Sequence, residues 1–248
     1  MAERKVLRLT LLETYRVNAD PYETSVPALV KGADETMSLM TAAQRADQHK
    51  QVAASTGEDR GALERAWRHD DYFENLSRAR KALLRSAHAS CWRWGEESEA
   101  MWRLYCGTRD GVAVRTTVEK LEAFARQQPH TCISRISYRD YATQSFERYG
   151  FDYDPAFHKR QAFKHEQEIR VLRWRKDDFR RAAENTAFDA GGSVELPNWD
   201  LEEIADEIVV NPLCSNEYFE AVAMALGRIS PVLGARVKLS DHRIDPRW

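Results

Sequence analysis

Short strand-like and helix-like segments follow one another irregularly through this chain, and this order constrains its fold more than any other feature. Residues 89–94 and 131–138 alternate polar and apolar side chains, as expected for strands with one buried face. Helix signals lie between them, because Ser98 can cap a helix over 99–105 and Thr116-Thr117-Val118-Glu119 has the form of a capping box. No regular strand–helix–strand repeat is present, so we predict the α+β class.

The same patterns outline the rest of the chain. Further strands are predicted at residues 6–14, 111–115, 166–174, 204–210 and 236–239. Further helices are predicted at residues 33–55, 58–87, 156–165 and 215–226, and the best loop candidate is 184–199. Since no stretch resembles a flexible linker, we predict one domain over 1–248 with a mixed sheet and with 33–87 as a helical insertion or subdomain.

Charge and hydropathy exclude some classes of protein. The chain has 37 Lys and Arg against 39 Asp and Glu, a net charge of −2, which argues against a globally basic nucleic-acid binder. No apolar run approaches the roughly 18 residues that a membrane span needs, so we predict no membrane partner. The start of the chain lacks the apolar stretch of a signal peptide, and the four cysteines form no C-x-x-C pair. We therefore expect a cytoplasmic protein with free thiols.

Several common site motifs are absent from the sequence. It has no phosphate-binding P-loop, no G-x-G-x-x-G turn, no G-x-S-x-G elbow and no H-E-x-x-H helix. His158 and His165 lie seven residues apart, but neither the usual zinc spacing nor a third ligand accompanies them. We therefore predict no metal site.

The segment Glu166-Gln167-Glu168-Ile169-Arg170 is the richest in chemistry. If it is extended, Glu166, Glu168 and Arg170 project from one face of a strand. Two carboxylates and a guanidinium can orient a sugar hydroxyl, or they can stabilise an oxocarbenium-like centre as a glycosidic bond breaks. The alternative is a solvated strand face whose charges pair across the sheet.

Residues 158–181 carry a local excess of positive charge, with nine Lys or Arg against four Asp or Glu. Trp174 and Phe179 lie among these charges, so the region could grip phosphates and stack a base, as a nuclease or an RNA-binding effector would. The alternative is a charged surface that the acidic run 200–207 balances.

Tryptophans concentrate in two nearby segments. Ser90-Cys91-Trp92-Arg93-Trp94 and Met101-Trp102-Arg103-Leu104-Tyr105 contain three of the seven. Aromatic side chains this dense either form core or wall a pocket for a planar ligand.

An ordered set of motifs resembles one bacterial family of proteins of unknown function, the family numbered 2971. The motifs are Asp20-Pro21-Tyr22-Glu23 with Val26-Pro27, Ser90-Cys91-Trp92, Glu97-Ser98-Glu99-Ala100-Met101-Trp102 with Tyr105, Gly111-Val112-Ala113-Val114, Phe163 with Glu166-Gln167-Glu168-Ile169-Arg170, and Ile208-Val209-Val210-Asn211-Pro212. Members usually carry an aromatic-rich strand before the Asp-Pro turn, and we expect that segment to be short or missing here.

The resemblance implies a further likeness, to the ADP-ribosyltransferase fold. By that analogy Glu168 assists cleavage of the nicotinamide–ribose bond of NAD and Glu166 helps it. Ser90 lies on the middle strand, and Trp92 and Trp102 wall the nicotinamide pocket. We add Tyr105, Arg170, Asp20 and Glu23 to the expected binding residues. The expected protein is an NAD-dependent transferase, as a toxin or anti-phage effector; the alternatives are the nucleic-acid effector and a non-catalytic binding domain.

Overall fold

The computed structural model describes residues 4–18, 69–106, 110–140 and 153–242, and it confirms an α+β fold. The predicted helix over 33–55, the first part of that over 58–87, and Asp20 and Glu23 lie outside the described residues.

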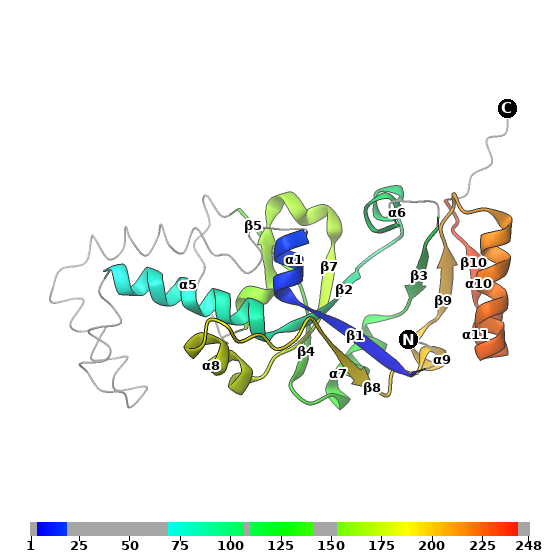
Figure 1. Ribbon diagram of the computed structural model, residues 1–248. Helices are drawn as coiled ribbons and strands as arrows, with labels where there is room; N and C mark the ends of the chain where they lie inside the picture. Colours follow the sequence, from blue (N-terminus) through cyan, green and yellow to red (C-terminus); the bar gives the residue numbers. More distant parts are fainter. Residues whose placement is uncertain (1–3, 19–68, 107–109, 141–152, 243–248) are drawn as a thin grey trace.

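A five-stranded antiparallel sheet, here called the central sheet, stands in the middle of the molecule (Figure 1). Its strand order is β4-β7-β2-β1-β8. The strands are β1 (Val6–Leu11), β2 (His88–Arg93), β4 (Thr131–Arg135), β7 (Glu168–Arg173) and β8 (Ser193–Pro197).

A three-stranded sheet, here called the small sheet, lies to the right of the central sheet in Figure 1. In it β9 (Glu207–Val210) pairs antiparallel with β3 (Val112–Arg115) and parallel with β10 (Val237–Leu239). A separate parallel pair joins β5 (Ser137–Arg139) to β6 (His158–Arg160).

Helices enclose these sheets. They are α1 (Leu12–Asn18), α5 (His69–Ser86), α6 (Glu99–Cys106), α7 (Val118–Gln127), α8 (Lys176–Glu184), α9 (Leu201–Ile204), α10 (Asn216–Ile229) and α11 (Pro231–Ala235). Two 3₁₀ helices, η1 (Asp154–Phe157) and η2 (Gln161–Glu166), precede β7.

Side-chain caps stand at the starts of several helices, among them α6, α7 and α10. The hydroxyl oxygen of Ser98 accepts from the Met101 amide at 3.2 Å, as predicted for α6, and that of Ser215 accepts from the Tyr218 amide at the start of α10. At α7 the cap is Thr117, one residue later than the predicted box, and it accepts from the Lys120 amide. The Thr116 hydroxyl instead donates to the Ile204 carbonyl at 2.6 Å, which ties α7 to α9.

The two faces of the central sheet pack against different cores. On one face Leu12 of α1 and Leu83 and Leu84 of α5 contact Leu172 of β7. On the other face Leu7 and Leu9 of β1 pack with α7 and with the buried Trp199. Because side chains alternate along a strand, neighbouring residues of β2 or β7 belong to different faces.

Four local predictions are wrong. The strand predicted over 6–14 ends at Leu11, where Leu12 turns into a helix and packs into the core. The segment predicted as a loop over 184–199 contains β8, because its backbone pairs with β1 despite a loop-like composition. The strand predicted over 131–138 divides between two sheets at Ile136, and the helix predicted over 156–165 is replaced by η1, β6 and η2.

The central sheet forks between β1 and β2. These strands pair only at Thr10–Ala89 and Leu11–His88. Beyond that point β1 continues along β8 and β2 continues along β7, so the two inner strands diverge toward the small sheet (Figure 1).

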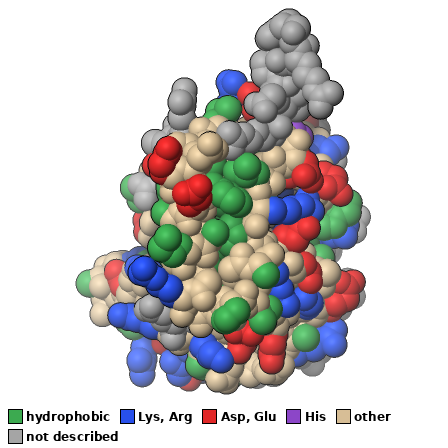
Figure 2. Space-filling view, turned by 90° about the vertical axis from the view of Figure 1, so that its right-hand side faces the viewer, with side chains coloured by type: hydrophobic (Ala, Val, Ile, Leu, Met, Phe, Trp, Pro, Cys, Tyr) green, Lys and Arg blue, Asp and Glu red, His purple; other side chains and the backbone are tan. Residues whose placement is uncertain are grey.

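Helices α10 and α11 cover the outer side of the small sheet (Figure 1). Leu226 and Leu233 pack on Ile208 and Val237 there. The surface beyond them retains apolar side chains, and Figure 2 shows such side chains gathered on this face between acidic and basic ones. The exposed apolar residues of α10, α11 and the turn before α10 are Leu213, Met224, Ile229 and Val232.

Candidate functional site

A cavity of about 480 Å³ lies at the fork of the central sheet and faces the small sheet. Its walls come from β1, β2, β3, α6, α7 and the loop before α6, with single residues from β7 and β9. This volume falls within the range of small-molecule sites, which are concave, largely apolar and supplied with a few polar groups. We call it the fork cavity.

Four of the binding residues predicted from sequence line the fork cavity: Ser90, Trp92, Trp102 and Tyr105. Trp92 is half-buried and its ring centroid lies 5.7 Å from that of Trp199. Trp102 is buried, whereas Tyr105 keeps 60% of its surface exposed. The structure therefore brings the two tryptophan-bearing segments together around one hollow.

Three arginines also line the fork cavity. Arg93 donates to the carbonyl oxygen of Glu96, and Arg115 pairs with Glu207 at 2.7 Å. The Arg8 side chain is exposed and makes no hydrogen bond or ion pair with any other residue that the structure describes. Arg8 is therefore the guanidinium best able to bind an anionic group of a ligand.

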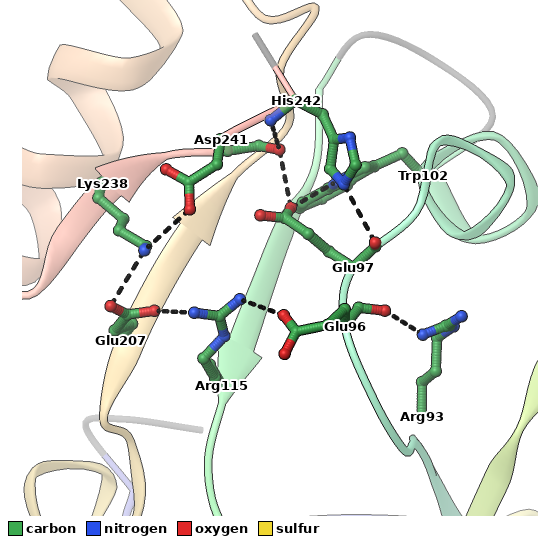
Figure 3. Close-up of polar contacts among 10 residues, drawn as sticks. Arg93, Glu96, Glu97, Trp102, Arg115, Glu207, Lys238, Asp241 and His242 are labelled. Carbon is green, nitrogen blue, oxygen red and sulfur yellow. Dashed lines mark hydrogen bonds and ion pairs between the residues drawn. The ribbon is translucent and has the colours of Figure 1, made fainter.

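Glu97 is a cavity residue whose role sequence reasoning missed. Its Oε2 accepts from the Trp102 indole nitrogen at 3.0 Å and from the Ser240 hydroxyl at 2.7 Å, and its backbone oxygen lies 3.0 Å from Nε2 of His242 (Figure 3). Ser240 and His242 follow Glu97 by 143 and 145 residues, so no local pattern could have indicated these contacts.

A row of ion pairs runs beside Glu97 along the small sheet (Figure 3). Glu207 contacts both Arg115 and Lys238, the latter at 3.0 Å. Arg115 also reaches Glu96 at 3.7 Å, and Lys238 reaches Asp241 at 3.6 Å. These groups are exposed or half-exposed, so each pair contributes little to stability, but together they hold the loop before α6 against β3.

The predicted catalytic glutamates lie in a different place, which we call the ion-pair cluster: Lys159, Glu166, Glu168 and Arg170. Lys159 Nζ lies 2.7 Å from Glu166 Oε2 and 2.6 Å from Glu168 Oε2. Arg170 Nε lies 2.8 Å from Glu168 Oε1 and its Nη1 donates to the Ala156 carbonyl. Arg170 is fully buried, and the Glu168 side chain is 3% exposed. None of these four side chains lines the fork cavity.

The backbone explains how the two glutamates meet. The strand predicted to start at Glu166 starts at Glu168 instead, because Glu166 ends η2 and Gln167 adopts a left-handed φ of 46°. Glu166 and Glu168 are therefore joined through Lys159 rather than by sharing a strand face.

The ion-pair cluster fixes the ionisation of Glu168. Burial alone would raise the pKa of Glu168, but the charges of Arg170 and Lys159 and hydrogen bonds from Arg170 and Cys91 lower it to about 2. The carboxylate is thus ionised and already compensated, as in a structural ion-pair network.

Cys91 contacts both the fork cavity and the ion-pair cluster. It lines the cavity, and its side chain hydrogen-bonds to Glu168. Burial raises the pKa of the Cys91 thiol to about 12, so the sulfur is a thiol rather than a thiolate nucleophile. Loss of solvation raises the pKa of Tyr105 to about 12 as well, with smaller contributions from the charges of Glu166 and Glu168.

Two charges of the basic region 158–181 are not at the protein surface. Lys159 and Arg170 are buried in the ion-pair cluster. Trp174 and Phe179 pack against each other, with ring centroids 5.9 Å apart, beside the core of α1 and α5. Both rings are half-buried in this packing.

The described residues contain no group of three His, Cys, Asp or Glu side chains that could hold a metal ion. Within the same part of the chain, no helix has both the length and the apolar character needed to cross a membrane.

Fold and site together define an α+β protein with a small-molecule-sized cavity at a forked sheet. Residues 101–171 match the model of a family described as a protein of unknown function (DUF2971), the family that the sequence motifs resemble. The segment contains Trp102 and Tyr105 of the fork cavity and the whole ion-pair cluster. No curated protein and no solved structure matches the chain significantly.

Proposed function

We propose that this chain binds a nucleotide in the fork cavity and that NAD is its ligand. The observation that carries the proposal is the combination of aromatic walls with a guanidinium that has no partner among the described residues. Trp92 and Trp102 line the same hollow as Arg8. Aromatic rings suit a planar base, and a guanidinium suits the pyrophosphate.

Cleavage of NAD is the second part of the proposal. An ADP-ribosyltransferase-like reaction needs a carboxylate near the nicotinamide–ribose bond, where positive charge develops. Glu97 is the acidic residue among those that line the fork cavity, whereas Glu168 does not line it and hydrogen-bonds to Cys91. Binding therefore has more direct support than cleavage by the Glu166–Glu168 pair.

Calorimetric titration of the purified full chain with NAD tests the binding step. Arg8→Gln should weaken NAD binding about tenfold, because a charge-assisted hydrogen bond to phosphate contributes roughly 1.5–3 kcal/mol. Arg4→Gln is the matched control, since Arg4 is an exposed arginine close in sequence that does not line the cavity. Absence of NAD binding at millimolar concentration to the folded chain would overturn the proposal.

Release of nicotinamide from NAD and transfer of ADP-ribose to protein test the cleavage step. Glu97→Gln should abolish turnover if the cavity carboxylate assists bond breaking. If folded Glu97→Gln still turns over NAD and folded Glu168→Gln does not, the catalytic carboxylate would be Glu168, as the resemblance implied. NAD binding without turnover would leave a non-catalytic nucleotide-binding domain.

A further inference from the structure

Two polar atoms in the walls of the fork cavity are buried without a hydrogen-bond partner: the indole nitrogen of Trp92 and Oε1 of Glu97. One is a donor and the other is an acceptor. A buried polar group without a partner costs roughly 1–3 kcal/mol, so such groups are uncommon and call for an explanation. Here a donor and an acceptor, both without partners, lie in the walls of one cavity.

Both side chains are held in place by other contacts. Oε2 of Glu97 is fixed by Trp102 and Ser240, which leaves Oε1 as the oxygen without a partner. The Trp92 ring packs on Trp199, which in turn meets Phe124 edge-on at 4.9 Å. These contacts hold the two side chains in the wall, and because both atoms have almost no accessible surface, a ligand can reach them only if each side chain rotates toward the hollow.

We propose that Glu97 and Trp92 recognise the carboxamide of the nicotinamide ring, and this inference rests on the proposed binding of NAD. A carboxamide carries an N–H donor for Glu97 and a carbonyl acceptor for Trp92 on one carbon. It can turn about its bond to the ring to meet both walls. The nicotinamide ring of NAD is also cationic, which suits an anionic carboxylate and the faces of aromatic rings.

Recognition of the carboxamide predicts that the chain discriminates between NAD and its carboxylate analogue. Nicotinic acid adenine dinucleotide replaces the carboxamide by a carboxylate, which has no donor for Glu97 and repels its charge. The wild-type chain should therefore bind NAD at least about tenfold more tightly than the acid analogue. The hypoxanthine analogue of NAD, which alters only the adenine, should bind as NAD does.

Two variants test the two atoms separately in the same calorimetric titrations. Glu97→Gln retains an oxygen for Trp102 and Ser240 but offers N–H groups in place of Oε1, so the preference for NAD over the acid should fall below about threefold. Trp92→Phe removes the donor and should weaken NAD binding by roughly three- to tenfold.

Matched controls exist for both changes. Trp174→Phe also removes a buried indole N–H without a partner, but outside the cavity, and should leave binding unchanged. Glu99→Gln changes a carboxylate two residues away that pairs with Arg103 on the exposed side of α6, and should also have no effect.

The outcomes separate the inference from the proposed function. Equal affinity for NAD and its acid analogue would overturn carboxamide recognition while leaving NAD binding intact. A loss of affinity confined to the hypoxanthine analogue would also overturn it, because Trp92 and Glu97 would then bind the adenine rather than the carboxamide. No binding of any dinucleotide would overturn both.

Discussion

Two groups of polar side chains near the central sheet can be compared directly: the ion-pair cluster and the wall of the fork cavity. In the cluster, Glu168 is buried between two cations and both of its oxygens are engaged. In the wall, Glu97 has one oxygen engaged and one buried without a partner, and Arg8 is exposed without a partner among the described residues. Compensated charge indicates a structural role, whereas uncompensated polar atoms beside a cavity indicate a place for a ligand.

The strongest test of this contrast is Glu168→Gln. It leaves Lys159 and Arg170 buried with less negative charge to compensate them, and breaking a buried pair in this way costs roughly 3–5 kcal/mol. We expect a loss of that size in the free energy of unfolding, measured with urea. The Glu166 side chain is 16% exposed and pairs with Lys159, so Glu166→Gln should lower the free energy of unfolding by only about 1 kcal/mol. Similar small losses for both would contradict the structural role.

A consequence for activity assays follows from this expectation. Loss of turnover in Glu168→Gln has no mechanistic meaning unless the variant is shown to be folded under the assay conditions. Glu97→Gln has no such difficulty, because its amide oxygen can keep the contacts to Trp102 and Ser240.

The second largest effect is a dependence of stability on pH. Folding lowers the pKa of Glu168 from 4.5 to about 2, so the unfolded chain binds this proton more readily. The corresponding stability is complete above about pH 5 and is lost as the pH falls through 2, with a size of about 3 kcal/mol. Urea unfolding at a series of pH values measures it. A wild-type profile no steeper than that of Glu168→Gln would refute this cause.

On the cavity side we expect a smaller effect from Trp102→Phe. The change removes the indole donor to Glu97 and leaves Ser240 as the donor to Oε2. A hydrogen bond to a charged acceptor contributes about 1.5–3 kcal/mol, and retained packing of the ring should keep the loss near 1–2 kcal/mol. Trp94→Phe, at an exposed ring beneath Arg135, should change stability by less than about 0.5 kcal/mol.

The last prediction concerns Cys91, which lines the fork cavity and hydrogen-bonds to Glu168. With a pKa of about 12 the thiolate fraction at pH 8 is about 10⁻⁴, so iodoacetamide should modify Cys91 at least about a hundredfold more slowly than a free cysteine. Mass spectrometry of the native protein measures the rate, and the unfolded protein provides the reactive control. Rapid modification in the native state would mean that the Cys91 thiol is accessible and that burial does not raise its pKa in this way.

Local signals predicted much of the fold. The cap of α6 and the strands around residues 89–94 and 111–115 follow from hydrogen bonds or alternation within a few residues, and they were predicted correctly. The strand β8 was missed because its pairing with β1, nearly 190 residues away, overrides a composition rich in turn formers.

The site was harder to predict for the same reason. Aromatic density indicated Trp92 and Trp102, and the structure places both in one cavity. Charge density indicated Glu166 and Glu168, but the sequence could not show that Lys159 and Arg170 compensate them. Glu97 belonged to one family motif but had no role attached to it, since Ser240 and His242 reach it from the far end of the chain.

The ion-pair cluster has a consequence for how related sequences can diverge. Lys159, Glu166, Glu168 and Arg170 carry two positive and two negative charges, so losing one of them alone leaves a charge of the cluster uncompensated. Among relatives these four positions should therefore change together, for instance to apolar residues of similar volume. The positions of Arg8, Trp92 and Glu97 have no such mutual dependence and should instead vary with the molecule that each relative recognises.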